Sequence, residues 1–294
     1  MARLRLLITA ILCALIWLAP LSAVNADEDS SFFRAGVGFF QQGRYLEAVE
    51  QFSAAIQVRP TSAAYSNRCL SYIQLSVYDQ AIADCSEAIA LAPENSEAYL
   101  NRGIAAYRTG NSDAAIVDYT QLLQFQPKDY RAYYNRGLAQ AEQRHYRAAL
   151  QDFNAALQQV SPLDQETHAV ILNDRGTVYL AMADYQVAIA DFTRAIQASP
   201  LFVSATFNRG CAYHRAGNLV AALQDFDQVI NLDHTFAQAY LNRGLLHHQL
   251  GQQQAAIADL EIAAEQFQQQ DFLPGYRKTL EWLEKVHTHY SAYV

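Results

Sequence analysis

The chain has 294 residues, a formal net charge of −8 and a pI near 5.4, and 51% of its residues are hydrophobic against 17% charged. That balance excludes an intrinsically disordered chain, which combines low hydrophobicity with a high density of charge. An acidic protein also lacks the basic face that binds the phosphates of nucleic acid, so we expect no nucleic acid partner.

Residues 1–26 are expected to be a signal peptide. Two basic residues, Arg3 and Arg5, precede an apolar run at 6–19, and the segment ends in Val24-Asn25-Ala26. This order is typical of a secretory signal, and the apolar run is shorter than the roughly 20 residues that span a bilayer. We therefore expect export to a periplasm, a lumen or the extracellular space. The alternative is a membrane anchor formed by an uncleaved 6–19 segment, and membrane contact is expected only in that case.

From residue 29 onward the chain repeats itself. The triplet Asn-Arg-Gly recurs with variations, and its third residue serves as a marker that we number position 8 of each copy. The markers are Gly36, Cys69, Gly103, Gly137, Gly176, Gly210 and Gly244, at intervals of 33, 34, 34, 39, 34 and 34 residues. Position 20 is alanine in every copy, and position 24 is usually a bulky residue. A fixed period of this size indicates an array of supersecondary units.

The pattern resembles the tetratricopeptide repeat, a helix-turn-helix unit with a period of 34 residues. The resemblance covers residues 29–268 and implies an all-α fold, a right-handed α-solenoid (superhelix) of antiparallel helix pairs. The seven expected copies lie at about 29–61, 62–95, 96–129, 130–163, 169–202, 203–236 and 237–270. A C-terminal capping helix and tail are expected at 271–294. The long interval between copies four and five predicts a longer loop at 161–168.

Two charged positions vary together. Copies two to seven have Arg at position 7 and Asp at position 23, whereas copy one has Ala35 and Gln51 instead. This joint presence predicts a structural ion pair across the two helices of each copy. The predicted pairs are Arg68–Asp84, Arg102–Asp118, Arg136–Asp152, Arg175–Asp191, Arg209–Asp225 and Arg243–Asp259. The alternative is a row of arginines that bind acidic ligands.

Two cysteines show the same offset as the charged pairs. Cys69 and Cys85 are 16 residues apart, at positions 8 and 24 of copy two, so they should lie near each other across the hairpin. Export permits a disulfide between them. Two buried thiols that act as small apolar side chains are the alternative.

The sequence offers little other chemistry. We find no nucleophile motif, no glycine-rich phosphate loop and no Cys-x-x-Cys motif in it. His214 and His248 share position 12 of adjacent copies, and side chains one repeat apart are too distant to ligate one metal ion. We therefore expect no enzymatic activity, no metal site and no cofactor.

The family resemblance implies a scaffold that binds a peptide or protein segment in a concave groove. By family geometry, positions 2, 5, 9, 12 and 13 of each first helix face this groove, and Tyr107 and Tyr134 occupy two of these positions. The residues at these positions are more apolar in copies one to four than in copies five to seven. Position 6 is asparagine in five copies: Asn67, Asn101, Asn135, Asn208 and Asn242. These residues resemble the asparagine ladder in the repeat domain of O-GlcNAc transferase, which implies that their carboxamides bind a peptide backbone through donor and acceptor atoms.

Three alternatives stay open. The asparagines could have a local role, such as bonding to the carbonyl of a neighbouring helix. The whole protein could be a membrane-anchored assembly or stability factor for a membrane protein complex. It could also be an adaptor that assembles through an end or its convex face.

Overall fold

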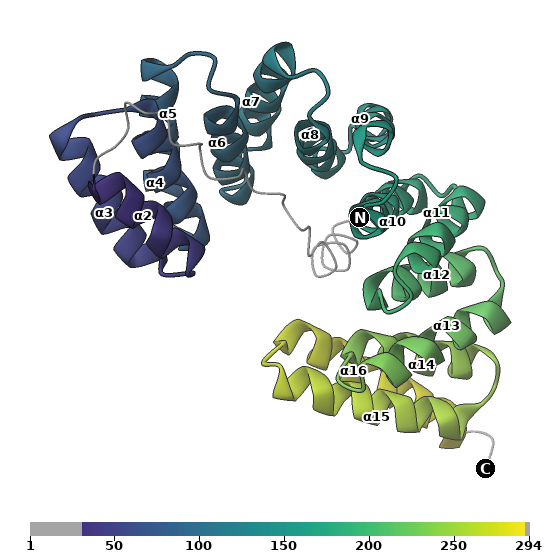
Figure 1. The fold of residues 1–294 in the computed structure, drawn as a ribbon. Helices are drawn as coiled ribbons and strands as arrows, with labels where there is room; N and C mark the ends of the chain where they lie inside the picture. The colour runs from purple at the N-terminus through teal and green to yellow at the C-terminus, as the bar shows by residue number, and fades with distance from the viewer. Residues whose placement is uncertain (1–30, 292–294) are drawn as a thin grey trace. The chain divides into compact units, whose positions relative to one another are not determined.

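The computed structural model describes residues 31–291, so the expected signal peptide and the last three residues lie outside the described part of the chain. Within that part the protein forms fifteen α-helices and no strand (Figure 1). The helices fall into two compact units, an N-terminal unit ending at Ser161 and a C-terminal unit beginning at Pro162. The expected all-α class of antiparallel helix pairs is confirmed.

The N-terminal unit consists of four helix pairs, which correspond to copies one to four. Its helices are α2 (Ser31–Gln41), α3 (Tyr45–Val58), α4 (Ser62–Gln74), α5 (Tyr78–Leu91), α6 (Ser96–Arg108), α7 (Ser112–Phe125), α8 (Tyr130–Glu142) and α9 (Tyr146–Gln159). Each helix packs on the next one along the chain, and α4 also contacts α6.

The C-terminal unit contains three helix pairs and a final helix. Its helices are α10 (Gln165–Ala181), α11 (Tyr185–Ala198), α12 (Val203–Arg215), α13 (Leu219–Leu232), α14 (Ala237–Gln249), α15 (Gln253–Gln269) and α16 (Leu273–Ser291). Helix α16 packs on α15 and also contacts α14. No helix in residues 31–291 is long and apolar enough to cross a bilayer.

Small residues allow the two helices of a pair to approach closely. The alanine at position 20 is fully buried in all seven copies. The residue at position 24 is an aromatic ring in five copies, and it lies against the position-8 glycine of the same pair, as Phe153 does against Gly137. Because position 8 has no side chain there, the ring fills the space between the helices.

The insertion between copies four and five lies elsewhere than expected. The sequence predicts a longer loop at 161–168, but α10 already begins at Gln165 and runs for 17 residues, against 13 in α8. Asp164 caps this helix, since its carboxylate accepts hydrogen bonds from the backbone N–H and the hydroxyl of Thr167. A capping carboxylate satisfies the free donors of a first turn, so most of the extra residues extend the helix.

Candidate functional site

The position-7 arginines and the position-23 aspartates lie face to face within each helix pair. In copies two to seven the guanidinium donates two hydrogen bonds of 2.6–2.9 Å to the two carboxylate oxygens. The aspartate side chains are buried and the arginines partly so. Each arginine therefore already holds its own carboxylate, which argues against a row of arginines that is open to acidic ligands.

The aspartates also change the electrostatics of the arginines. The hydrogen bond from Arg136 to Asp152 raises the pKa of the guanidinium above its ordinary value, although burial acts in the opposite direction. Tyr133 lies beneath the same guanidinium, with the ring centroid 5.8 Å from its central carbon. A bidentate, partly buried pair of this kind is stronger than an exposed salt bridge.

Sequence reasoning missed a second contact of these arginines. In five copies Nη1 donates to position 25 of the preceding copy. The bonds are Arg68 to Ser53 (2.8 Å), Arg102 to Ser86 (3.1 Å), Arg136 to Thr120 (3.0 Å), Arg209 to Thr193 (3.3 Å) and Arg243 to Asp227 (2.6 Å). A hydroxyl or carboxylate at position 25 was the signal in the sequence that could have indicated this link.

The position-6 asparagines lie inside the packed structure. Asn67, Asn101, Asn135 and Asn208 are 1–4% exposed, and Asn242 is partly buried. Buried carboxamides are normally hydrogen-bonded. Among residues 31–291, however, Asn101 Oδ1 and Asn135 Nδ2 are both buried without a hydrogen-bond partner. One is an acceptor and the other a donor, and they belong to adjacent copies.

The asparagines of the C-terminal unit differ, because their amide groups bond to neighbouring side chains. Asn208 Nδ2 donates to Asn173 Oδ1 at 2.9 Å, and Asn173 Nδ2 donates to Asp174 Oδ1 at 3.0 Å. Asn242 Nδ2 lies 3.6 Å from the sulfur of Cys211. The local role that the sequence left open is thus seen in this unit, with side chains rather than backbone carbonyls as acceptors.

The two tyrosines expected in the groove have different surroundings. Tyr107 is partly buried at the edge of the core of its unit. Tyr134 is fully buried, and its ring centroid lies 6.0 Å from that of Phe153 on the other helix of the pair. The expectation that Tyr134 lines an open groove is therefore corrected: position 5 contacts the aromatic position 24, and the Tyr134 ring belongs to the core.

Cys69 and Cys85 are joined by a disulfide in the structure, with a distance of 5.5 Å between their Cα atoms. Both residues are fully buried between α4 and α5. Of the two alternatives that the sequence left open, the structure contains the bonded one.

His214 and His248, which share position 12 of adjacent copies, each lie beside a glutamine side chain. His214 lies 3.2 Å from the side-chain oxygen of Gln249, and His248 lies 2.8 Å from that of Gln253. Within residues 31–291, no group of three or more His, Cys, Asp or Glu side chains could hold a metal ion.

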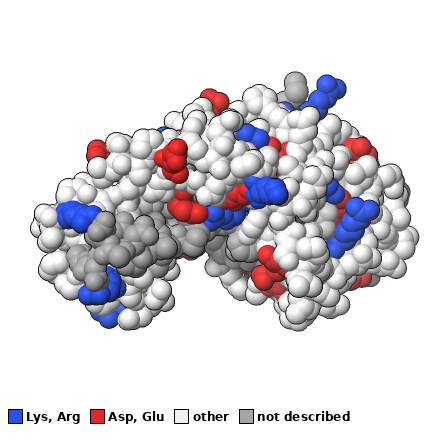
Figure 2. Space-filling view, turned by 45° about the horizontal axis from the view of Figure 1, so that its top comes forward, with Lys and Arg blue, Asp and Glu red and all other residues white. Residues whose placement is uncertain are grey.

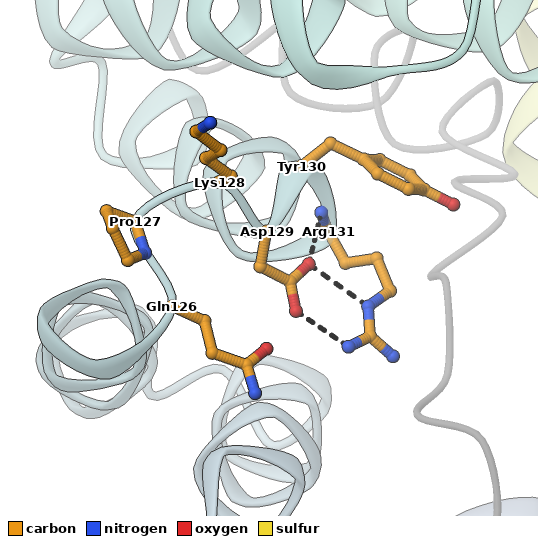
Figure 3. Close-up of a pocket in the computed structure, with 6 residues that line it drawn as sticks. All are labelled: Gln126, Pro127, Lys128, Asp129, Tyr130 and Arg131. Carbon is orange, nitrogen blue, oxygen red and sulfur yellow. Dashed lines mark hydrogen bonds and ion pairs between the residues drawn. The ribbon is translucent and has the colours of Figure 1, made fainter.

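A shallow pocket lies at the connection between α7 and α8, and residues Gln126 to Arg131 line it (Figure 3). Arg131 bonds to Asp129 through Nε and Nη2, and it also reaches Glu97 of the preceding copy. In Figure 3 the side chains of Lys128 and Tyr130 point away from this pair. The charges of Arg131 are thus compensated within the protein, and the pocket has no group aimed at a ligand.

Charged side chains are scattered over the face of the protein that Figure 2 shows. On the face shown in Figure 2, basic and acidic residues alternate among neutral ones and form no continuous basic patch. Nothing on this face suggests a phosphate backbone as ligand.

The family of the chain follows from its repeats. Tetratricopeptide repeats match at residues 33–96, 67–126, 100–163 and 173–234, and a further one matches at 237–266. The chain belongs to the tetratricopeptide repeat (TPR) family. Arrays of such repeats are interaction modules that present extended binding surfaces.

Solved structures agree with this fold. A TPR protein from Parabacteroides merdae is similar with a TM-score of 0.64 and 21% identity, over 87% of this chain and 100% of that one. YrrB, described as a TPR protein with an unusual peptide-binding site, is similar with a TM-score of 0.53 and 21% identity, over 68% of this chain and 97% of that one. At this level of identity the likeness shows the fold alone.

Curated relatives match over shorter stretches. Hsp70-Hsp90 organizing protein 3 of Arabidopsis thaliana is 39% identical over 59 residues, which are 20% of this chain and 11% of that protein. Mitochondrial import receptor subunit TOM34 of Homo sapiens is 32% identical over 75 residues, or 25% of this chain and 24% of the relative. The chain therefore spans less than a quarter of the length of these TPR relatives.

Proposed function

We propose that this TPR protein is an exported, non-catalytic scaffold that binds an extended peptide or protein segment along its first helices. YrrB is described as having an unusual peptide-binding site, and the Arabidopsis relative is named an Hsp70-Hsp90 organizing protein. The support from this chain itself comes from the asparagines at position 6.

The observation that carries the proposal is the pair of unsatisfied carboxamide atoms in copies three and four. A buried polar atom without a hydrogen-bond partner costs about 1–3 kcal/mol. Asn101 presents an acceptor and Asn135 presents a donor on adjacent first helices. Both atoms are buried, so a segment reaches them only when the side chains that cover them move aside. An extended backbone offers N–H and C=O groups in alternation, and it would then supply both missing partners without regard to its side chains.

The same reasoning assigns the binding to particular copies. Asn208 and Asn242 already have hydrogen-bond partners from the C-terminal unit, so a ligand would have to replace those bonds. Copies three and four would gain bonds that are otherwise missing. We therefore place the main backbone contacts at Asn101 and Asn135, and residues around them would select among segments.

The experiment uses a peptide enriched from a random display library on the purified protein, with its affinity measured by fluorescence anisotropy. Replacement of Asn101 and Asn135 together by Ala should weaken binding at least tenfold, because two backbone hydrogen bonds of about 0.5–1.5 kcal/mol each are lost. The thermal midpoint should change little, since Asn101 Oδ1 and Asn135 Nδ2 have no hydrogen-bond partner within residues 31–291. Asn208→Ala with Asn242→Ala is the matched control, which should lower the midpoint and affect binding less.

Two results would contradict the proposal. A large fall in the midpoint with unchanged affinity in the Asn101 and Asn135 variant would mean that these residues hold the helices together. Failure of the library to yield any peptide that binds would argue against a peptide scaffold altogether.

Export is tested separately, at the N-terminus of the native protein. The order of basic, apolar and small residues in 1–26 supports cleavage after Ala26, so N-terminal sequencing should begin at Asp27. A protein that begins at Met1 and sediments with membranes would support the anchored assembly factor instead.

A further inference from the structure

Positions 8 and 24 of each copy share a single small volume between the two helices. A Cβ atom built on the position-8 glycine would lie only 2.5–3.0 Å from the nearest ring carbon of position 24 in five copies. The five pairs are Gly36 with Phe52, Gly103 with Tyr119, Gly137 with Phe153, Gly176 with Phe192 and Gly210 with Phe226. A ring at position 24 therefore requires glycine at position 8.

Copy two fills this volume in a different way. Cys69 stands at position 8 and Cys85 at position 24, so two short side chains replace one large ring and one hydrogen atom. Both are fully buried, and the disulfide brings their sulfurs together inside the core of the N-terminal unit. The Cα atoms of the pair are 5.5 Å apart, a separation at which a disulfide joins two cysteines without movement of the backbone. The bonded pair therefore fits the spacing of these helices.

Separation of the two sulfurs would disturb more than one contact. Arg68 and Asp84 precede the two cysteines directly and form the ion pair of this copy. Arg68 also donates to Ser53 on α3, which belongs to copy one. Any outward shift of α4 from α5 therefore acts on a bidentate ion pair and on the link to the preceding copy.

We propose that copy two reaches its final packing only when Cys69 and Cys85 are oxidised, so that the protein is a substrate for a disulfide-forming oxidant of the dithiol–disulfide class. In this reaction the two thiols lose two protons and two electrons as the sulfur–sulfur bond forms. The disulfide of the oxidant accepts both and is left as two thiols. Because both cysteines are inaccessible in the folded hairpin, the exchange takes place before α4 and α5 close or during a transient opening.

The third described cysteine does not compete in this exchange. Burial raises the pKa of the Cys211 thiol to about 12. The thiolate is the form that attacks disulfides, and it is rare at neutral pH for such a group. Cys211 also belongs to the C-terminal unit, whereas the pair belongs to the N-terminal one.

The pairing is tested by alkylation of the denatured, unreduced protein and peptide mass spectrometry. Cys211 should carry the label, and Cys69 and Cys85 should be recovered as one linked peptide pair. Labelled thiols at both 69 and 85 in protein from an oxidising compartment would overturn the proposal.

The packing argument is tested by thermal melting with and without a dithiol reductant, with reduction verified by alkylation. The reductant should lower the midpoint of the wild-type protein by at least about 3 °C, the shift that corresponds to a destabilisation of roughly 1 kcal/mol in a protein of about 150–250 residues. The double variant Cys69→Gly with Cys85→Phe installs the glycine and phenylalanine pair that four other copies use. It should melt near the oxidised wild type and be indifferent to the reductant. Cys211→Ser keeps the disulfide, so its midpoint should fall on reduction as that of the wild type does.

A second double variant tests the same packing argument and does not depend on whether Cys69→Gly with Cys85→Phe folds. Cys69→Ser with Cys85→Ser leaves two short side chains without a bond, and it should melt near the reduced wild type in either condition. A midpoint equal to that of the oxidised wild type would overturn the proposal. The same conclusion would follow if fully reduced wild-type protein melted where the oxidised protein does.

Discussion

At the scale of single residues, the arginine of position 7 combines three contacts in one side chain. Arg102 donates to both oxygens of Asp118, reaches Ser86 of the preceding copy at 3.1 Å, and lies over the Tyr99 ring at 5.7 Å. The carboxylate is buried and the guanidinium only partly so. The arginine therefore joins its own helix pair and the previous pair through one rigid group.

This arrangement predicts a specific coupling between Arg136 and Asp152. In a double-mutant cycle with alanine, measured by urea unfolding, their coupling should be about 1–3 kcal/mol, because the pair is bidentate and its carboxylate is buried. Asp118 belongs to the neighbouring pair and bonds to Arg102, so Arg136 with Asp118 serves as the control and should couple by less than about 0.5 kcal/mol. The opposite ranking would mean that the ion pairs form between copies.

Two glycines offer a second test at this scale. A Cβ on Gly103 would lie 2.5 Å from Cε1 of Tyr119, whereas a Cβ on Gly38 would meet no atom within 4 Å. Gly103→Ala should therefore destabilise the protein by about 1–3 kcal/mol through overpacking. Gly38→Ala, also in a helix of the N-terminal unit, should stabilise it by about 0.5–1 kcal/mol. Similar effects of both substitutions on the urea midpoint would refute the close helix contact at Gly103.

At the scale of the helix pair, the turn between the two helices demands a left-handed residue. Gly110 and Gly217 have φ near +81° at position 15, and Ala183 has φ +61° at the equivalent position of copy five. For residues with a Cβ this conformation is unfavourable by roughly 1–2 kcal/mol, whereas for glycine it is not. In copy five the turn therefore places Ala183 in a backbone conformation that alanine disfavours.

A glycine at this turn should relieve that cost. We expect Ala183→Gly to stabilise the protein by about 1 kcal/mol in thermal or urea unfolding. The reciprocal change Gly110→Ala should destabilise it by a similar amount. If Ala183→Gly were destabilising, flexibility gained by the unfolded chain would outweigh the relief of the turn.

The helix pair also shows what the sequence could and could not predict. The period, the alanine of position 20 and the paired Arg and Asp predicted helices that pack in antiparallel pairs, because each of these signals reflects a contact within one copy. The extension of α10 was missed, since an insertion of five residues can lengthen a helix or a loop, and only the cap by Asp164 decides between them.

The candidate site was harder to predict for a related reason. A repeated asparagine indicates a shared position but not its hydrogen-bond partners, which lie in other copies, as Asn173 does for Asn208. The burial of Tyr134 depends likewise on Phe153 across the pair. The period alone does not determine which side of the first helix is covered.

At the scale of the whole molecule, the described chain has two units, and each contains buried hydrophobic clusters. The N-terminal core includes Cys69, Ile104 and Leu122, and the C-terminal core includes Phe226, Leu260 and Phe267. The boundary between the units falls between Ser161 and Pro162, in the segment that joins α9 to α10.

This boundary should be the first site of proteolysis. Leu163 is 92% exposed, and exposed connections are preferred sites of nicking. Brief chymotrypsin digestion of the native protein should cut after Leu163 and yield two fragments that mass spectrometry can identify. Phe125 is also a chymotrypsin site at the end of a helix but is only 36% exposed, and it should be cut later. Earlier cleavage at Phe125 would contradict the order of local stability inferred here.

The shared volume at positions 8 and 24 has a consequence for how this sequence can change over generations. A lineage that starts from glycine and phenylalanine cannot reach two cysteines in one step. Cysteine in place of the glycine first would collide with the ring, at a cost of about 1–3 kcal/mol. Cysteine in place of the phenylalanine first would leave a cavity, and losses of this kind reach about 3–5 kcal/mol for phenylalanine to alanine. The free energy of unfolding of a domain is only about 5–15 kcal/mol. A sequence with only one of the two cysteines therefore stays folded only if the rest of the chain is stable enough to offset the loss. In this protein, arginine side chains link five of the copies to the preceding one and add to the stability of the stack. The replacement of glycine and phenylalanine by two cysteines can therefore be tolerated in an inner copy such as the second.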